Sequence, residues 1–495
     1  MTQLNPEYMT LKQTKIVASI SDLRCEEDFI RSLFKAGMNV VRMNTAHGTQ
    51  EGMTKLIANV RRVSNSIALL IDTKGPEVRT TTIAGGADTI TFHVGDKVRI
   101  VGKPDVLTTR EQIAVSYPNF VRDLELGADV LIDDGEIEMK VVEKGADYLT
   151  CEVLNESVLG HRKSVNVPGV RINLPSLTEK DKRNIQFAID NDLDFIAHSF
   201  VRNRQDILDI RKILDERHSD IQIIAKIENQ EGVDKIDEII EAADGVMVAR
   251  GDLGIEVPQE NIPGIQRAII RKCVHARKPV IVATQMLHTM IEHPRPTRAE
   301  VTDIANAIYS NTDAVMLSGE TAYGKYPVEA VETMTRVARR AEADKTPDLD
   351  IVMHVADEPD VTAFLAKQAV KSTALLPVKA IITDSYSGRT ARYLASYRGK
   401  VPVLAICHSE KTMRRLALSY GVEAVYLPGK VNGQDYYFSA LYMLLNKGVL
   451  SPNEMVAYLS SGLQSTHTTF LEINKVSEVL EAGASYVLPN SNKLV

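Results

Sequence analysis

The chain has 495 residues, of which 44% are hydrophobic and 25% charged, so it carries enough apolar material for about three folded domains. This composition excludes a disordered or fibrous chain. A formal net charge of −7, an aromatic content of 5% and the absence of Trp argue against nucleic-acid or membrane partners, and no apolar run reaches the roughly 20 residues of a membrane helix.

Eight short runs rich in Val, Ile, Leu and Met recur along the chain, and each is followed by a segment with helical periodicity. Continuous apolar strands that alternate with amphipathic helices are typical of a parallel sheet covered by helices. Eight such units predict a (β/α)8 barrel, in which the chemistry lies at the carboxyl ends of the strands. Asn203 and Thr297 are the expected starts of two of the helices. The runs are Ile16–Ile20, Met38–Met43, Ile67–Ile71, Leu193–Ala197, Ile221–Ala225, Gly245–Ala249, Pro279–Ala283 and Asp313–Leu317.

The alternation is interrupted twice. After the third run, strand-like segments separated by GG, DDG and KGAD turns predict an inserted small β domain. After a helix ending near Asp344, a connecting segment leads to a renewed α/β pattern with strands VKAIIT, PVLAIC, VEAVYL and EMVAYL. We therefore expect four segments: barrel residues 1–80, an inserted β domain at 81–170, barrel residues 171–345 and a C-terminal α/β regulatory domain at 346–495.

Four widely separated Cys residues, with no CxxC pair, favour reduced thiols over a disulfide framework or a zinc site. The N-terminal segment also lacks the apolar core of a secretory signal. These features predict a cytoplasmic protein.

The predicted fifth and sixth strands end in chemically suggestive residues. Lys226 and Glu228 are two apart, so their side chains point to the same side of the strand, and Asp252 follows the next strand at the same rim. Two carboxylates beside a lysine suit a magnesium ion completed by substrate oxygens and water, with the lysine neutralising a transferring phosphoryl group. The alternative is a structural ion pair among the three residues.

The residues at the other strand ends favour a substrate site over a structural ion pair, because acidic and basic residues occur close together along the whole rim. This pattern predicts a site for a metal-bound, multiply anionic substrate. A P-loop-like segment, Gly319–Lys325, is discounted because Tyr326 stands where a magnesium-binding hydroxyl is required. The further rim residues are Arg42, Asn44, Asp72, Thr73, Lys74, Glu77, Arg79, Ser199, Arg202, Thr284, Gln285, Ser318 and Glu320.

In the third domain a hydroxyl-rich segment precedes a predicted helix. Hydroxyls and free amides at a helix N-terminus can bind a phosphate, so this segment is a candidate effector site. The alternative is an ordinary N-cap by Ser387 or Thr390. The candidate residues are Ser385, Ser387, Gly388, Arg389 and Thr390.

The barrel region resembles the pyruvate kinase family. The matching words occur in the family's order between Thr14 and Ala341, and a looser resemblance continues through the third domain. They include TKIVASI, GMNVVRMNTAHG, IDTKGPEVRT, IIAKIENQEGV, DGVMVARGDLGIEVP, KPVIVATQML and AVMLSGETAYGKYPVEAV. The resemblance implies transfer of the phosphoryl group of phosphoenolpyruvate to ADP in glycolysis, with Mg²⁺ (or Mn²⁺) and K⁺ as cofactors. It further implies a homotetramer, and a sugar-phosphate or nucleotide effector on the last domain. It also implies that the inserted β domain is a small β-barrel that forms a lid.

The resemblance also implies roles for individual residues. Lys226 corresponds to the lysine that stabilises the phosphoryl group, Arg42 to the arginine that holds the phosphate, and Thr284 to the threonine beside the enolate. The remaining roles are magnesium ligation by Glu228 and Asp252; backbone contacts to substrate by Ala249, Arg250 and Gly251; potassium ligation by Asn44, Asp72 and Thr73; nucleotide binding by His47 and Arg79; and membership of the potassium-dependent subgroup, marked by Glu77 and Thr80.

The chain departs from the family pattern at several places. Ala46 stands where the family usually has Ser, which removes one potassium ligand and implies weaker potassium affinity. Further departures are Ser19–Asp22, His288, the segment 460–473 and a tail from about Val476. Two rival functions are a magnesium-dependent lyase or aldolase acting on pyruvate enolates, and a catalytically silent sugar-phosphate sensor. The potassium-site residues and the lid argue against the first, and intact Lys226 and Thr284 argue against the second.

Overall fold

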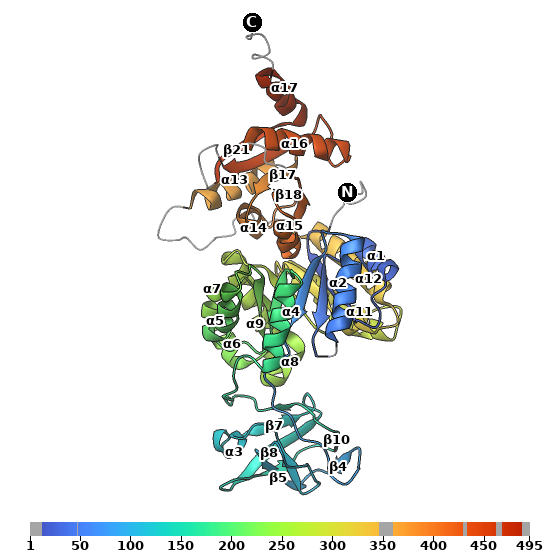
Figure 1. Ribbon diagram of the computed structural model, residues 1–495, viewed down its shortest axis with the longest axis vertical. Helices are drawn as coiled ribbons and strands as arrows, with labels where there is room; N and C mark the ends of the chain where they lie inside the picture. Colours follow the sequence, from blue (N-terminus) through green and yellow to red (C-terminus); the bar gives the residue numbers. More distant parts are fainter. Residues whose placement is uncertain (1–11, 47, 346–359, 429–432, 462–467, 488–495) are drawn as a thin grey trace.

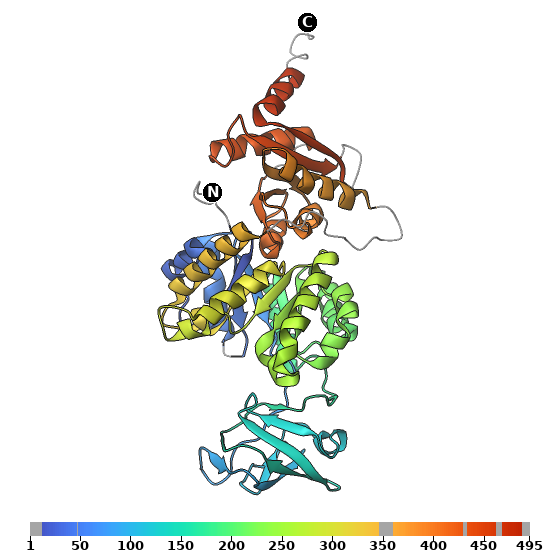
Figure 2. The ribbon, with the colours of Figure 1, turned by 180° about the vertical axis from the view of Figure 1, so that it is seen from behind.

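Three bodies lie in a row along the long axis of the molecule (Figure 1). The computed structural model describes residues 12–46, 48–345, 360–428, 433–461 and 468–487. The α/β barrel lies in the middle, the inserted β unit at one end and the C-terminal domain at the other, an arrangement that the reverse view in Figure 2 confirms. His47 and the predicted connecting segment at 346–359 lie outside the described residues.

Eight parallel strands close into the central barrel, which confirms the predicted architecture. Each strand begins or ends within two residues of the predicted run, and nearly all of their residues are buried because helices cover the outer face. The order around the barrel is β1-β16-β15-β14-β13-β12-β3-β2. The bounds are β1 Lys15–Ser19, β2 Val40–Asn44, β3 Ala68–Asp72, β12 Phe195–His198, β13 Gln222–Ile227, β14 Gly245–Ala249, β15 Val280–Ala283 and β16 Ala314–Leu317.

The covering helices begin where capping residues allow it. The Asn203 side chain accepts from the amide of Asp206, and Thr297 forms a capping box with Glu300, so both predicted starts are confirmed. The helices are α1 Glu27–Ala36, α2 Gln50–Val63, α4 Glu179–Asp190, α5 Arg204–Glu216, α6 Gln230–Asp234, α7 Ile236–Ala242, α8 Arg250–Glu256, α9 Ile262–His275, α10 Arg298–Tyr309, α11 Gly319–Ala322 and α12 Pro327–Asp344. None of the described helices is both long and apolar enough to cross a membrane.

The inserted unit between β3 and α4 has its own apolar core, which includes Phe92, Phe120 and Met139. Its strands form a six-stranded sheet, β11-β7-β8-β9-β5-β6, and a two-stranded sheet, β10-β4. Closure of these sheets into a small barrel, and the exact limits 81 and 170, stay predictions. The elements are β4 Ile90–Phe92, β5 Lys97–Val101, β6 Gln112–Ala114, α3 Phe120–Asp123, β7 Asp129–Ile132, β8 Ile137–Lys144, β9 Leu149–Val153, β10 Ser157–Leu159 and β11 Val165–Asn166.

The C-terminal domain is a separate five-stranded sheet in the order β19-β18-β17-β20-β21. The four predicted strands are present, and β21 adds an antiparallel edge strand that begins within the segment 460–473 and ends two residues beyond it. The tail begins with helix α17, whose first residue, Val476, is fully buried. The elements are α13 Val361–Leu375, β17 Val378–Ser385, α14 Arg389–Ser396, β18 Val403–Cys407, α15 Glu410–Arg415, β19 Val422–Tyr426, α16 Gly433–Asn446, β20 Met455–Ser461, β21 Thr468–Lys475 and α17 Val476–Val487.

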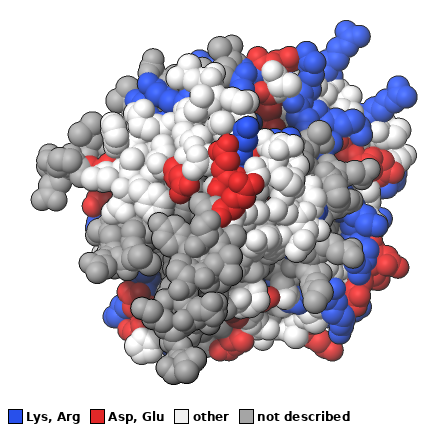
Figure 3. Space-filling view, turned by 90° about the horizontal axis from the view of Figure 1, so that it is seen from above, with Lys and Arg blue, Asp and Glu red and all other residues white. Residues whose placement is uncertain are grey.

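The end of the molecule formed by this domain carries charges of both signs. In Figure 3 acidic side chains lie near the middle of this face and basic ones along its edges.

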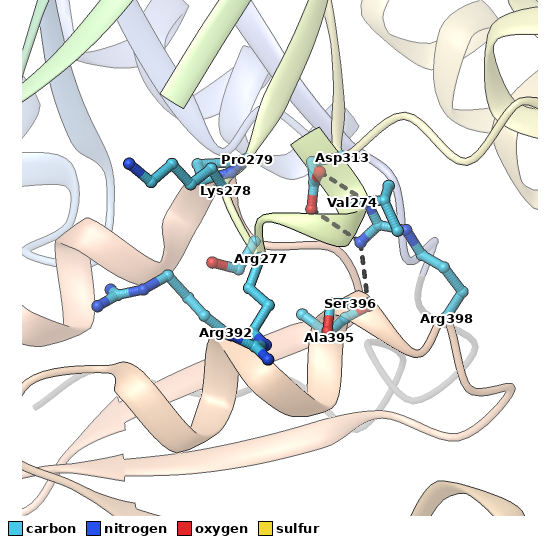
Figure 4. Close-up of a pocket in the computed structure, with 10 residues that line it drawn as sticks. Val274, Arg277, Lys278, Pro279, Asp313, Arg392, Ala395, Ser396 and Arg398 are labelled. Carbon is cyan, nitrogen blue, oxygen red and sulfur yellow. Dashed lines mark hydrogen bonds and ion pairs between the residues drawn. The ribbon is translucent and has the colours of Figure 1, made fainter. Parts of the chain in front are cut away.

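Buried ion pairs join the C-terminal domain to the amino ends of the barrel strands. Arg398 donates to both carboxylate oxygens of Asp313 at 2.9 and 2.7 Å, with only 3% and 5% of the two side chains exposed (Figure 4). Arg414 contacts the fully buried Asp194 at 2.7 Å. A buried pair that loses one partner leaves an uncompensated charge, so these contacts hold the two bodies in one arrangement.

One apolar side chain of the C-terminal domain enters the barrel itself. Leu418, in the 3₁₀ turn Leu416–Leu418, is fully buried and belongs to the same apolar cluster as the side chains that fill the barrel interior, such as Phe195 and Met247. The bottom of the barrel core is thus completed by a residue from another domain.

Candidate active site

Polar side chains converge at the carboxyl ends of the barrel strands, the end that faces the inserted unit. The predicted proximity of Lys226 and Glu228 is confirmed, because Lys226 Nζ lies 2.8 Å from Glu228 Oε1. Burial alone lowers the pKa of Lys226, but the charges of Glu228 and Asp72 outweigh it and raise the pKa above its ordinary value. Lys226 is therefore a buried, permanently charged ammonium group.

Glu228 and Asp252 form a second close pair. Burial and the charge of Glu228 raise the pKa of Asp252 to about 7, which means that the two carboxylates repel each other. Glu228 Oε2 also accepts from the amide of Phe200 at 2.6 Å, which fixes its orientation. Among the described residues no three His, Cys, Asp or Glu side chains form a metal cluster. The pair fits a divalent cation that draws its other ligands from substrate and water.

Arg42 and Asp72 meet at the ends of β2 and β3. Arg42 Nε donates to Asp72 Oδ2 at 2.8 Å, and Arg42 Nη1 donates to Ser19 Oγ at 2.9 Å. The other carboxylate oxygen, Asp72 Oδ1, is buried and has no hydrogen-bond partner among the described residues. An unsatisfied buried carboxylate oxygen is costly, so this atom fits a bound cation.

The neighbouring loop supplies further oxygens. Asn44 Oδ1 accepts from the amide of Ala46 at 3.0 Å, and the Thr73 carbonyl accepts from Ser199 Oγ at 2.7 Å. Thr73 Oγ1 lies 3.2 Å from His198 Nδ1. Burial lowers the pKa of His198 to about 4, so this ring is neutral.

Glu77 lies farther along the same loop, where two cations already face it. Its carboxylate is 2.6 Å from Arg79 and 3.5 Å from Lys74. Arg79 and Lys74 therefore already offset the charge of Glu77. The structural support for a bound monovalent cation comes from Asp72 Oδ1, which has no hydrogen-bond partner among the described residues. Thr80 is buried beside this loop and accepts from the amide of Lys163 through its hydroxyl at 2.9 Å.

A second group of predicted residues follows β14 and β15. Thr284 Oγ1 accepts from the amide of Gly251 at 2.8 Å and donates to the carbonyl of Ala283 at 2.6 Å. Thr284 and the next residue both adopt positive φ, at 68° and 54°, which is strained for residues with a Cβ. Ala249 ends β14 directly before Arg250 and Gly251, so the structure brings this group together at one rim.

Arg250 is held in place from two sides. Its guanidinium donates to both oxygens of Asp303 at 2.7 Å and to the carbonyl of Thr284 at 2.6 Å. Both contacts to Asp303 come from Nη1, while Nη2 donates to Thr284, so two separate partners fix the guanidinium. Arg79, by contrast, lies on the connection to the inserted unit, where it contacts Glu77 and the carbonyl of Arg162.

The candidate effector residues lie in the C-terminal domain, far from this rim. Ser385 Oγ accepts from the amide of Gly388, which has φ of 81° and is the N-cap residue of α14. The alternative of an N-cap by Ser387 or Thr390 is therefore wrong, because the turn needs the positive φ that Gly tolerates. Thr390 Oγ1 instead contacts Thr468 at 2.9 Å.

Two residues that hold the arginines of the site were not predicted as site residues from the sequence. Ser19 accepts from Arg42, and Asp303 holds Arg250 from helix α10. The first falls in the segment Ser19–Asp22, which departs from the family pattern. The second carries no sequence signal, because only the fold brings Asp303 of α10 near Arg250 at the start of α8.

Comparisons with known proteins agree with this geometry. A family model described as the pyruvate kinase barrel domain matches residues 11–331, and one described as the pyruvate kinase alpha/beta domain matches residues 364–473. The chain belongs to the pyruvate kinase family. It is therefore a phosphotransferase of glycolysis, and the lyase and silent-sensor alternatives are set aside.

Individual relatives align along nearly the whole chain. The pyruvate kinase of Borreliella burgdorferi is 47% identical over 96% of this chain and 99% of its own, and that of Geobacillus stearothermophilus is 45% identical over 95% and 82%. A solved pyruvate kinase structure from Cryptosporidium parvum superposes with a TM-score of 0.89 at 35% identity, covering 95% of this chain and 97% of the other.

Proposed function

We propose that the rim of the barrel transfers the phosphoryl group of phosphoenolpyruvate to ADP, which gives pyruvate and ATP. The observation that carries this proposal is the buried, charged Lys226, held beside the mutually repelling pair Glu228 and Asp252. Such an arrangement supplies a fixed positive charge and a cation site side by side. Phosphoryl transfer needs this kind of positioning and charge neutralisation more than covalent catalysis.

In this proposal the chain's own residues do the following. Lys226 stabilises charge on the phosphoryl group in flight, Arg42 holds the substrate phosphate, and Thr284 lies beside the enolate that is protonated to pyruvate. Glu228 and Asp252 would hold Mg²⁺ or Mn²⁺, which supplies further charge neutralisation when bound. Substrate contacts come from Ala249, Arg250 and Gly251, and nucleotide contacts from Arg79 and His47.

We also propose a potassium site formed by Asn44, Asp72 and Thr73. Its support is the unpartnered Asp72 Oδ1, beside carbonyl and amide oxygens of the kind that hard cations prefer. The protein would act in the cytoplasm as a homotetramer. An anionic effector, a sugar phosphate or a nucleotide, would bind near Ser385, Ser387, Gly388, Arg389 and Thr390.

A coupled assay of pyruvate formation tests the reaction. We expect pyruvate to form only when phosphoenolpyruvate, ADP and a divalent cation are all present, with faster turnover when potassium replaces a bulky organic cation at constant ionic strength. Pyruvate release without ADP would contradict the phosphoryl transfer. Equal rates without potassium would contradict the potassium site alone.

Asp252→Asn tests the divalent-cation site. An amide oxygen is a poorer ligand than a carboxylate for a hard dication, and half the ligand charge is removed, so we expect the half-saturating magnesium concentration to rise about tenfold or more. Titration of activity with magnesium measures this shift, and circular dichroism checks the fold. An unchanged magnesium titration would place the cation elsewhere.

Ala46→Ser tests the potassium site. Restoring the hydroxyl adds one oxygen ligand, and water replacing the missing ligand reduces the gain, so we expect potassium to half-saturate at a several-fold lower concentration. Ala46→Val adds volume without a ligand and serves as the control. Equal potassium titrations for wild type and Ala46→Ser would show that position 46 does not face the ion.

A further inference from the structure

Ser199 is one of the polar residues at the barrel rim, and none of the roles assigned above belongs to it. It follows β12 directly, and it is 3% exposed. Its hydroxyl accepts from Lys226 Nζ at 2.8 Å and donates to the carbonyl of Thr73 at 2.7 Å. A buried hydroxyl that both accepts and donates in this way has no rotational freedom left.

The rest of Ser199 is fixed as firmly. Its backbone amide donates to Thr73 Oγ1 at 3.0 Å, so Ser199 and Thr73 exchange two hydrogen bonds across the ends of neighbouring strands β12 and β3. Gly75 has φ of 73°, and a Cβ at Gly75 would lie only 3.0 Å from the Ser199 Cβ, so the loop packs directly on this serine. The backbone thus determines where the Ser199 oxygen lies.

The Lys226 ammonium group has three N–H donors. Ser199 Oγ and Glu228 Oε1 each lie 2.8 Å from Nζ, whereas Asp72 Oδ2 is 3.8 Å away, beyond hydrogen-bond distance. The contact with Glu228 is an ion pair rather than a hydrogen bond, because Glu228 Oε1 has no hydrogen-bond partner among the described residues. Ser199 Oγ is therefore the acceptor that sets the direction of one N–H of the ammonium group. Without Ser199, only the ion pairs with Glu228 and Asp72 would hold the ammonium group, and ion pairs do not fix the direction of its N–H bonds.

We propose that Ser199 is a positioning residue for the reaction: its hydroxyl orients the Lys226 ammonium group toward the transferring phosphoryl group. This inference rests on the proposed role of Lys226. It follows that Ser199 acts on turnover through Lys226 and contributes little to ground-state binding of phosphoenolpyruvate. A misplaced charge loses effect in the transition state even when the substrate still binds.

Ser199→Ala removes the acceptor and keeps the backbone. One hydrogen bond to a charged group corresponds to about a tenfold effect or more, so we expect kcat to fall about tenfold while KM for phosphoenolpyruvate stays within about twofold. Ser199→Thr retains the hydroxyl and should keep most of the turnover. If the Ala variant does not fold, Ser199→Cys replaces it, because a thiol is close in size to the hydroxyl but forms a weaker hydrogen bond. We expect kcat to fall in this variant too, with KM for phosphoenolpyruvate little changed.

A double-mutant cycle separates positioning from a structural role. In a Lys226→Met background, Ser199→Ala should change kcat by less than about twofold, because the group that Ser199 orients is gone. A matched control is Ser396→Ala, since Ser396 is also 3% exposed and donates to a carbonyl, that of Tyr393, at 2.7 Å, but lies in α14. This control should keep wild-type kcat.

The outcomes distinguish the two proposals. An unchanged kcat for Ser199→Ala, or an equal fall in the wild-type and Lys226→Met backgrounds, would overturn the positioning role and leave the role of Lys226 intact. Near wild-type turnover for Lys226→Met by itself would instead overturn the proposed role of Lys226, on which this inference rests.

Discussion

Replacing Lys226 with Met should lower kcat by about 10²-fold or more, while the affinity for phosphoenolpyruvate changes little. The ammonium group is buried and its pKa is raised, so it is charged throughout the working pH range. Its charge has most effect when negative charge redistributes on the phosphoryl group. Steady-state kinetics from the coupled pyruvate assay, together with a fluorescence or calorimetric titration of substrate, measure the two quantities separately.

Lys325→Met is the matched control for this experiment. Lys325 belongs to the P-loop-like segment, its side chain is 64% exposed, and it forms an ion pair with Glu292 on the surface. We expect wild-type turnover for this variant. A large loss of turnover in Lys325→Met, or near wild-type turnover in Lys226→Met, would show that Lys226 is not the lysine that stabilises the phosphoryl group.

The second large effect is on stability. Arg398→Met should lower the free energy of unfolding by about 3 to 5 kcal/mol, because the carboxylate of Asp313 is left buried without its cation. The amides of Val280 and Tyr420 still donate to Asp313, at 3.1 and 3.0 Å, so the carboxylate keeps some hydrogen bonds. Urea unfolding followed by circular dichroism gives the midpoint and reveals whether the two bodies separate in two steps.

Arg340→Met provides the comparison for this measurement. Arg340 pairs with Asp344 within helix α12, but the two side chains are 78% and 42% exposed. Exposed pairs contribute no more than about 1 kcal/mol, so the unfolding midpoint should change little. If both variants unfold at the same urea concentration, the buried pair does not hold the two bodies together.

The barrel and its site could be predicted from the sequence because two simple periodicities determine them. Strands buried on both faces need uninterrupted apolar residues, and the first polar residues after each strand must lie at one rim. Lys226 and Glu228 illustrate the second point, since a spacing of two in a strand already places them on the same side. The roles of individual residues, such as magnesium or potassium ligation, came from the family resemblance and not from the periodicity.

Other features depend on contacts between segments far apart in the chain. Strand β21 lies at an edge, where only exposed and half-buried residues follow Thr468, so it lacks the apolar run that marks the other strands. Asp303 reaches Arg250 only because the fold brings α10 near the start of α8. The bonds of Ser199 likewise require β12 and β3 to be neighbours in the barrel. Local sequence carries no information about such juxtapositions.

Leu418 has a consequence for attempts to shorten the enzyme. The barrel core ends in a side chain that enters from the C-terminal domain, so a barrel expressed alone would open to water beneath Phe195 and Met247. Asp194 and Asp313 would lose Arg414 and Arg398 at the same time. A minimal catalytic unit would therefore need larger apolar side chains to fill the barrel interior from below and a neutral residue in place of Asp313. Asp194 would keep its ion pair with Arg61 of helix α2.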